Sequence, residues 1–234
     1  MVIGIDIGGT NTEFAVVDSI KGILHVEKIK TKSHDSFLNY IENFSEIVKD
    51  LAKKFNISSI GIGAPNFDSG SNTFCPVNFN WSDVSAFNLE QHLQNEVSIP
   101  TSVVNDANAV ALAENRYGIG RKVNSFIIIT IGTGLGAGIV INNRLFDGSY
   151  GYAGEFGHTK VDDIDRICNC GGVGCLETIV SANGIKRSIV EKLNLKSDKD
   201  APDVKSIFKK AKKSDVIYNE VLEYTFRILG KKLS

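Results

Sequence analysis

The 234-residue sequence has no run of eighteen or more apolar residues and no charged-then-apolar leader. We therefore expect no membrane partner and no export, and we place the chain in the cytoplasm. An excess of one charge is also missing, because 26 Lys and Arg offset 27 Asp and Glu, and the net charge of −1 offers no basic field for nucleic acid. At 42% hydrophobic, the chain can bury a substantial core, in one large domain or in two lobes.

Cysteine is scarce and clustered. Of the four cysteines, three share one short segment with a histidine: His158, Cys168, Cys170 and Cys175. Three thiols and one imidazole complete a tetrahedral zinc shell and leave no position for a catalytic water, so such a zinc would be structural. A disulfide or unrelated buried thiols are the alternatives, and a reducing cytosol favours metal. The sequence predicts a zinc loop that fixes the flanking carboxylates Glu155 and Glu177.

A strand, a glycine-rich turn and a second strand occur twice along the chain. The turns contain Gly8, Gly9 and Thr10 in the first copy, and Gly132, Thr133 and Gly134 in the second. Glycine supplies positive φ angles and lets the backbone approach a ligand closely. Most single glycine hairpins are only turns. Two equivalent ones facing each other could hold a chain of phosphates through N–H groups and hydroxyls, which is the interpretation we favour.

The order of the expected elements indicates an α/β protein. Three strands, a helix, a strand, a helix and a strand occupy the first half, which is the order of a ribonuclease-H-like lobe, and the pattern restarts at Phe126. We therefore predict two such lobes around a cleft, residues 1–118 and 119–234. After its three strands the second lobe continues only as helices over 176–193, 204–212 and 216–233. Because two further strands should follow, we expect this lobe to be truncated.

A polar pair opens one helix of the first lobe. A strand delivers Asn105 and Asp106 to the start of an alanine-rich helix, at the carboxyl end of the sheet, where open α/β sheets bind ligands. Both residue types are preferred helix N-caps, so a purely structural role is the simpler alternative. A cap needs only one of them, and Asp106 beside a bound hydroxyl could accept its proton as a general base.

Taken together, these segments resemble a known family. They are Asp6 to Thr10, Asn105-Asp106, Gly132 to Gly136, Glu155 to His158, and the stretch from Cys168 to Glu177. In this order they are similar to the ROK family (repressors, open reading frames, sugar kinases) of the actin and hexokinase ATPase fold group. Residues 61–65 and 105–109 add a likeness to the bacterial glucokinases within it.

The resemblance implies a role for each matching residue. It implies ATP-dependent phosphorylation of a hexose, glucose first, with Asp106 as the base on the 6-hydroxyl. The sugar contacts it implies are Asn78, Asn105, Glu155, His158 and Glu177. ATP phosphates would lie on both glycine turns, with Asp6 near Mg²⁺, and His158 would use one ring nitrogen for zinc and the other for sugar. It also implies a homodimer of the complete protein.

Alternatives to glucose phosphorylation stay open. Asn66 stands where relatives have glycine and Val77 where they have proline, so another hexose, such as N-acetylmannosamine or fructose, is the next candidate. A sugar-responsive repressor is disfavoured, because such relatives carry a helix-turn-helix before the first turn and tend to lose the aspartate at position 106. A non-catalytic sugar-binding fragment is the third alternative, since nothing after Gly230 resembles the family's adenosine-binding segment.

Overall fold

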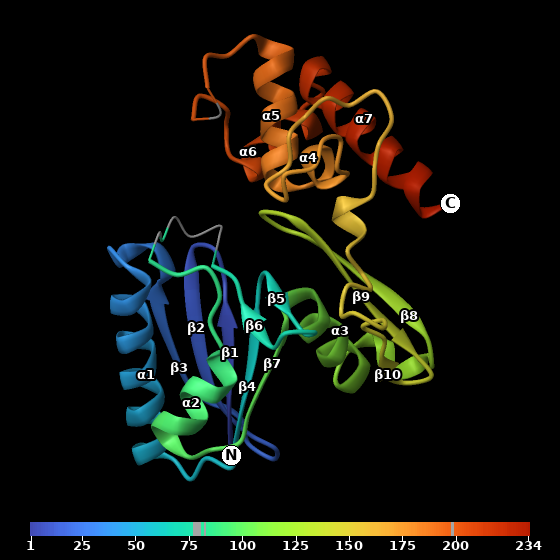
Figure 1. The fold of residues 1–234 in the computed structure, drawn as a ribbon. Coiled ribbons are helices and arrows are strands. Elements are labelled where there is room, and N and C mark those ends of the chain that lie inside the picture. The colour runs from blue at the N-terminus through green and yellow to red at the C-terminus, as the bar shows by residue number, and fades with distance from the viewer. Residues whose placement is uncertain (77–80, 82, 198) are drawn as a thin grey trace. The chain divides into compact units, whose positions relative to one another are not determined.

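The computed structural model describes residues 1–76, 81, 83–197 and 199–234. Within these ranges the chain forms two compact units, the first from residues 1–128 and 138–153, the second from residues 129–137 and 154–234 (Figure 1). The second glycine turn therefore belongs to the second unit, although both ends of its hairpin belong to the first. The division into lobes at residue 118 stays a prediction. Asn78 lies outside the described residues.

A five-stranded sheet organises the first unit. Its strands, in the spatial order β3-β2-β1-β4-β7, are β3 (Gly22–Lys30), β2 (Asn11–Asp18), β1 (Val2–Ile7), β4 (Ser59–Ala64) and β7 (Thr101–Asn105). The first three form antiparallel pairs, whereas β1, β4 and β7 run parallel. The carboxyl ends of three parallel strands consequently meet at one edge of the sheet, which is where such sheets bind ligands.

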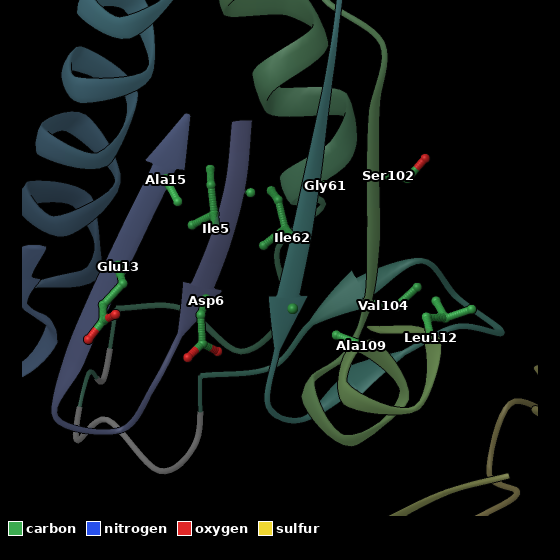
Figure 2. A pocket seen from close by; sticks show the side chains of 12 residues that line it. Ile5, Asp6, Glu13, Ala15, Gly61, Ile62, Ser102, Val104, Ala109 and Leu112 are labelled. Carbon is green, nitrogen blue, oxygen red and sulfur yellow. The ribbon is translucent and has the colours of Figure 1, made fainter. Parts of the chain in front are cut away.

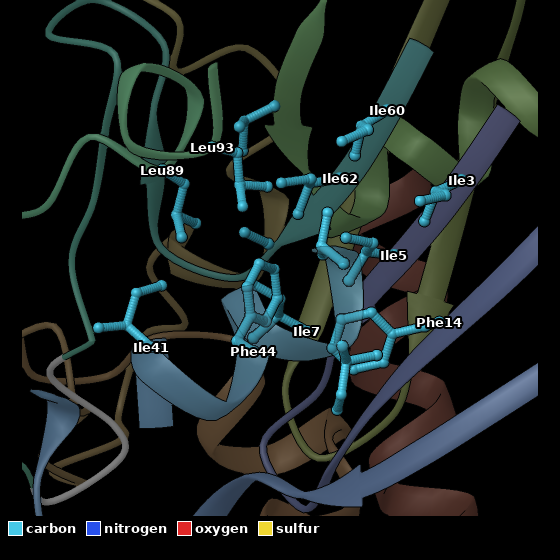
Figure 3. Packing of buried hydrophobic residues seen from close by; sticks show 14 of the residues in the cluster. Ile3, Ile5, Ile7, Phe14, Ile41, Phe44, Ile60, Ile62, Leu89 and Leu93 are labelled. Carbon is cyan, nitrogen blue, oxygen red and sulfur yellow. The ribbon is translucent and has the colours of Figure 1, made fainter. Parts of the chain in front are cut away.

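One face of this sheet is covered by α1 (Phe37–Lys54) and α2 (Leu89–Val97). Helix α1 begins where the Ser36 side chain accepts a hydrogen bond from Asn39 N. Its apolar positions are spaced three and four apart, so they form one stripe, and all of them are buried: Phe37, Ile41, Phe44, Val48 and Leu51. Figure 3 shows Ile41 and Phe44 packed with the inward-facing isoleucines of β1 and β4.

The other face of the sheet is lined by small residues. Ala15, Gly4, Gly61 and Ser102 are register partners across four neighbouring strands. Because these residues have little or no side chain, a hollow of about 520 Å³ opens over them (Figure 2). Helix α3 (Asp106–Arg116) contributes Ala109 and Leu112 to its wall. Asp6 and Glu13 are the charged groups of this mainly apolar lining, so the hollow offers little for acid–base chemistry.

Short elements complete the first unit. They are η1 (Thr31–Ser33), η3 (Ile119–Lys122) and the paired strands β5 (Phe67–Asp68) and β6 (Thr73–Phe74). The second glycine hairpin consists of β8 (Phe126–Ile131) and β9 (Leu135–Ile141), extended by β10 (Arg144–Leu145). The three strands expected after residue 126 are therefore present.

The second unit is mainly helical. After η4 (Phe156–His158) come α4 (Glu177–Val180), α5 (Ala182–Leu193), α6 (Val204–Lys212) and α7 (Val216–Leu233). The single helix predicted over 176–193 is wrong, because the chain is extended at Ser181, whose side chain caps α5 by accepting from Gly184 N. Ile185, Ile189, Ile207 and Leu222 are among the residues of its core.

No helix in the described ranges combines the length and the apolar character needed to cross a bilayer.

Candidate functional site

Two aspartates meet at the carboxyl edge of the first unit's sheet. Asp6 is the penultimate residue of β1 and pairs in register with Gly63 of β4. A Cβ added to Gly63 would lie 3.8 Å from Asp106 Cα and 3.2 Å from Ala109 Cβ, so glycine allows α3 to close on this strand. Burial, then the charge of Asp106, raise the pKa of Asp6. The two carboxylates are thus electrostatically coupled.

Asn105 is the N-cap of α3. Its Oδ1 accepts hydrogen bonds from Ala107 N at 2.9 Å and Asn108 N at 3.4 Å. The capping alternative is therefore correct for Asn105, as the preference of helix starts for Asn predicts. Its Nδ2 donates to no group in the described part of the chain and remains available to a ligand.

Asp106, the first residue of α3, is not needed as the cap. One carboxylate oxygen accepts a hydrogen bond from Ala107 N at 2.8 Å, and the other accepts none from another described residue. Partial removal from water raises the pKa of Asp106, although the Ala107 N–H acts in the opposite direction. A carboxylate with one uncommitted oxygen and a raised pKa is suited to accept a proton from a hydroxyl.

This raised pKa predicts an effect on stability with a definite sign. The folded state holds the Asp106 proton more tightly than the unfolded state, whose pKa is near 3.8, so stability falls as pH rises from 3.8 through the higher folded-state value. We expect Asp106→Asn to raise Tm at pH 7, by roughly 2–4 °C for each kcal/mol gained, and the gain to vanish below about pH 3.8.

Asp18→Asn is the matched control, because the Lys21 and Ile20 N–H groups lower the pKa of Asp18. Its replacement should lower Tm at pH 7. The measurement is thermal unfolding from pH 3 to pH 8, and equal behaviour of the two variants would contradict the prediction.

The first glycine turn begins two residues after Asp6, at the end of β1. Gly8 N donates to Asn11 O at 2.9 Å, and a Cβ on Gly8 would lie only 2.8 Å from that oxygen. The N–H groups of Gly9 and Thr10 have no hydrogen-bond partner within the described residues. A turn with two unpaired N–H groups beside a carboxylate is suited to bind a phosphate together with its metal ion.

The second glycine turn is anchored within the second unit. Gly132 N donates to Gly134 O at 3.0 Å, and Gly132 O accepts from Ala182 N at 2.9 Å. A Cβ on Gly134 would lie 3.0 Å from Glu177 Oε2. The structure thus brings this turn together with the sugar-contact candidate Glu177. Because the two glycine turns belong to different units, their cooperation on one ligand stays a prediction.

The predicted zinc ligands converge. The ligand atoms of His158, Cys168, Cys170 and Cys175 all lie within 4.8 Å of one another. Zn–S bonds of about 2.3 Å and Zn–N bonds of about 2.0 Å imply tetrahedral edges of roughly 3.8 Å (S to S) and roughly 3.6 Å (S to N). Cys170 and Cys175 Sγ are 3.7 Å apart, and Cys168 Sγ is 3.6 Å from His158 Nδ1. This donor set fits zinc, and none of the four cysteines of the chain forms a disulfide.

The histidine connects the metal cluster to a carboxylate. Its Nδ1 faces the cysteines, whereas its Nε2 lies 3.6 Å from Glu155 Oε2. A metal on Nδ1 would leave the proton on Nε2, so His158 would act there only as a donor. The Cys168 thiol donates to Glu177 Oε1 at 2.9 Å, and its deprotonation by a metal would free this carboxylate for a ligand.

Gly157 fixes the segment that carries Glu155 and His158. A Cβ at this position would lie 2.1 Å from the carbonyl oxygen of Leu135 in β9. We expect Gly157→Ala to destabilise the protein by roughly 1–3 kcal/mol, because backbone must move to relieve the contact. Urea unfolding measures the loss. Gly132→Ala is the control, since nothing lies within 4 Å of its added Cβ. Equal midpoints for both variants would refute the prediction.

A buried arginine was missed in the sequence. Arg166 donates to Thr178 O at 2.6 Å, Gly184 O at 3.3 Å, Ser188 Oγ at 2.9 Å and Glu191 Oε2 at 2.6 Å. It connects the cysteine loop to α4, which begins at Glu177, and to α5. The sequence around Arg166 is a polar loop, and nothing in its composition or spacing predicts that this arginine is buried.

Asn108 was missed as well. It is 7% exposed, and its buried Oδ1 has no hydrogen-bond partner among the described residues. An unpaired buried polar atom in the first turn of α3, close to Asp106, is an unusual feature.

Known proteins with similar sequences are sugar kinases and regulators. A glucokinase of Halalkalibacterium halodurans is 35% identical over 97% of this chain and 73% of its own length. A xylose repressor of Caldicellulosiruptor bescii is 33% identical over 82% of this chain and 49% of its own length. The chain therefore spans roughly half to three quarters of these relatives.

The solved structures show the same fold. A ROK family glucokinase from Streptomyces griseus, crystallised with glucose and AMPPNP, superposes with a TM-score of 0.81 at 31% identity, over 99% of this chain and 77% of that one. This confirms the predicted α/β fold of the actin and hexokinase group. The ROK family pattern matches residues 2–234, and the chain belongs to the ROK family.

Proposed function

We propose that this chain carries the catalytic residues of an ATP-dependent hexose kinase, with glucose as the preferred substrate and glucose 6-phosphate as the product. The observation that carries the proposal is Asp106: one free carboxylate oxygen, a raised pKa, and a place beside Asp6 at the carboxyl edge of the sheet. The glucokinase relatives support the same reaction.

In this proposal each polar group has one task. Asp106 takes the proton of the sugar 6-hydroxyl as the oxygen attacks the terminal phosphate. Asn105 offers its amide N–H groups, His158 its Nε2–H, and Glu155 and Glu177 their carboxylates to other hydroxyls of the sugar. Asn78, outside the described residues, remains a further proposed contact.

The nucleotide and both metals have proposed positions too. The glycine turns would bind the phosphates of ATP, whose charge Mg²⁺ near Asp6 would neutralise in part. The cysteine cluster would hold a structural zinc that fixes His158 and orients the segment between Glu155 and Glu177. Zinc has no open position here for substrate chemistry.

The test is an ATP-coupled assay of the 234-residue chain with glucose, fructose and N-acetylmannosamine, paired with calorimetry for each sugar alone. We expect phosphorylation of glucose at the highest kcat/KM. A higher value for another hexose would correct the substrate but keep the reaction. Sugar binding without turnover would favour the non-catalytic fragment or a regulator, and absence of both turnover and binding with all three sugars would contradict the kinase proposal.

A sugar-responsive regulator is the second candidate function, because the xylose repressor is nearly as similar to this chain as the glucokinase. A regulator needs sugar binding but no base. Tight sugar binding without turnover, unchanged in Asp106→Ala, would favour it.

A further inference from the structure

Three buried hydroxyls connect the first glycine turn to helix α1. Tyr40 Oη lies 2.9 Å from Thr12 Oγ1, which lies 3.0 Å from Thr31 Oγ1. Thr31 Oγ1 in turn donates to the carbonyl oxygen of Gly8 at 2.8 Å. All three side chains are 0% exposed. The groups come from α1, β2 and η1, so three separate elements meet behind the turn.

Counting protons fixes the direction of this chain of hydrogen bonds. A carbonyl oxygen can only accept, so the single hydroxyl proton of Thr31 is committed to Gly8. Thr12 must then donate to Thr31, and Tyr40 must donate to Thr12. Burial raises the pKa of Tyr40 well above its usual value, which keeps its proton in place.

Thr31 holds the turn at two points. Besides the hydroxyl contact with Gly8, its backbone N–H donates to the Thr10 carbonyl at 3.0 Å. Two carbonyl groups of the turn are therefore held by one residue. The N–H groups of Gly9 and Thr10, which no described residue accepts, remain for a ligand.

A purely structural explanation of the three hydroxyls is weaker. Buried hydroxyls lose hydration, and valine or phenylalanine would fill the same space without that cost. Their value lies in the partner at the end of the chain, the Gly8 carbonyl, because a buried hydrogen-bond chain is effective only when every member is satisfied.

We propose that Tyr40, Thr12 and Thr31 form a one-way hydroxyl relay that positions the first glycine turn for an incoming polyphosphate. They are positioning residues, since none touches the ligand. The identity of the ligand rests on the proposed kinase function, whereas the ordering of the turn does not.

The first experiment measures the turn itself in the 234-residue chain. We expect Thr31→Val and Thr12→Val to lower the amide order parameters of Gly9 and Thr10 from about 0.85 to below about 0.6, while Thr31→Ser keeps wild-type values. Ser45→Ala is the matched control, because it removes a hydroxyl of similar burial that bonds Ile41 O and His92 within α1 and α2. Unchanged turn order in both valine variants would overturn the proposal.

The relay also predicts that the effects of Tyr40→Phe and Thr31→Val on the turn are not additive. Tyr40→Phe should loosen the turn less than Thr31→Val, because Thr12 can still donate to Thr31. In a Thr31→Val background Tyr40→Phe should add nothing at the turn, since the chain is already broken at its last link. Additive effects on the turn order would contradict a serial relay. Tyr40→Phe keeps the ring and its packing, so it tests the hydroxyl without emptying the core.

The second experiment separates this inference from the kinase proposal. Calorimetry with inorganic tripolyphosphate and Mg²⁺ should show roughly fivefold weaker binding in Thr31→Val than in wild type or Thr31→Ser, the scale of one lost hydrogen bond. Glucose affinity should stay within about twofold. If the turn responds as expected but the wild-type chain binds no tripolyphosphate, the proposed function fails and the relay stands. Equal tripolyphosphate affinity in Thr31→Val and wild type would overturn the link from turn order to ligand binding.

Discussion

Asp106→Asn is expected to lower kcat for hexose phosphorylation by about 10²–10⁴-fold and to leave hexose affinity near wild type. The physical reason is that asparagine keeps the shape and the contact with Ala107 N but cannot take the hydroxyl proton. Glu155→Ala and Glu177→Ala should instead raise KM for the hexose first, because these carboxylates would hold hydroxyls rather than move protons. Steady-state kinetics with the hexose and ATP varied separately distinguishes the two patterns.

Asp18→Asn serves as the control for charge removal, because Asp18 ends β2 in the same unit and its carboxylate accepts hydrogen bonds from Ile20 and Lys21 N–H. It should retain full turnover. Full turnover in the Asp106 variant as well would exclude this residue as the base. A loss confined to KM would assign it to sugar binding instead.

Loss of the metal is expected to have the largest effect on the second unit. We expect one zinc per chain in protein prepared without added metal, and a fall in Tm of about 10 °C or more when a chelator removes it, which corresponds to roughly 3 kcal/mol or more. The cysteine loop contains two isolated β-bridges, Lys160 to Cys175 and Ile167 to Val173, and only Val161 and Ile164 of this loop pack against a described apolar cluster. Glucose binding should weaken when the metal is removed, because the proposed sugar contacts His158 and Glu177 lie at the two ends of the cysteine loop.

The matched pair for this prediction is Cys175→Ser and Cys75→Ser. Both remove one sulfur, but only Cys175 belongs to the cluster. Elemental analysis should show zinc lost in the first variant and kept in the second. Sub-stoichiometric zinc in the wild type, together with alkylation of the three clustered thiols in the native state, would contradict a structural metal site.

Much of this fold was predictable because its signals are local. The stripe on α1 follows from apolar spacing, and each glycine hairpin follows from two apolar strands around an interrupted turn. The convergence of His158 with three cysteines was predictable because Cys and His at short spacing are typical of metal sites, and the zinc itself stays a prediction.

What failed or was missed depends on distant partners. The break at Ser181 arises because Ala182 N reaches Gly132 O, a contact between segments fifty residues apart in sequence. Thr12 and Thr31 look like ordinary polar residues until the fold places Thr12 between Thr31 and Tyr40. Along α7, Leu233 belongs to the apolar stripe and yet is 56% exposed. Periodicity predicts which face of a helix is apolar, but it does not predict which residues cover that face.

The two polar atoms of the Asn105 side-chain amide have different roles: one caps a helix, and the other is available for the proposed sugar contact. Its oxygen caps the start of α3, and its nitrogen donates to none of the described residues. Aspartate at this position would cap the helix equally well while turning a donor into an acceptor and placing two carboxylates in succession. Any loss of sugar affinity in such a variant, at unchanged unfolding midpoint, would therefore measure the loss of the amide donor and the added charge rather than the integrity of the helix.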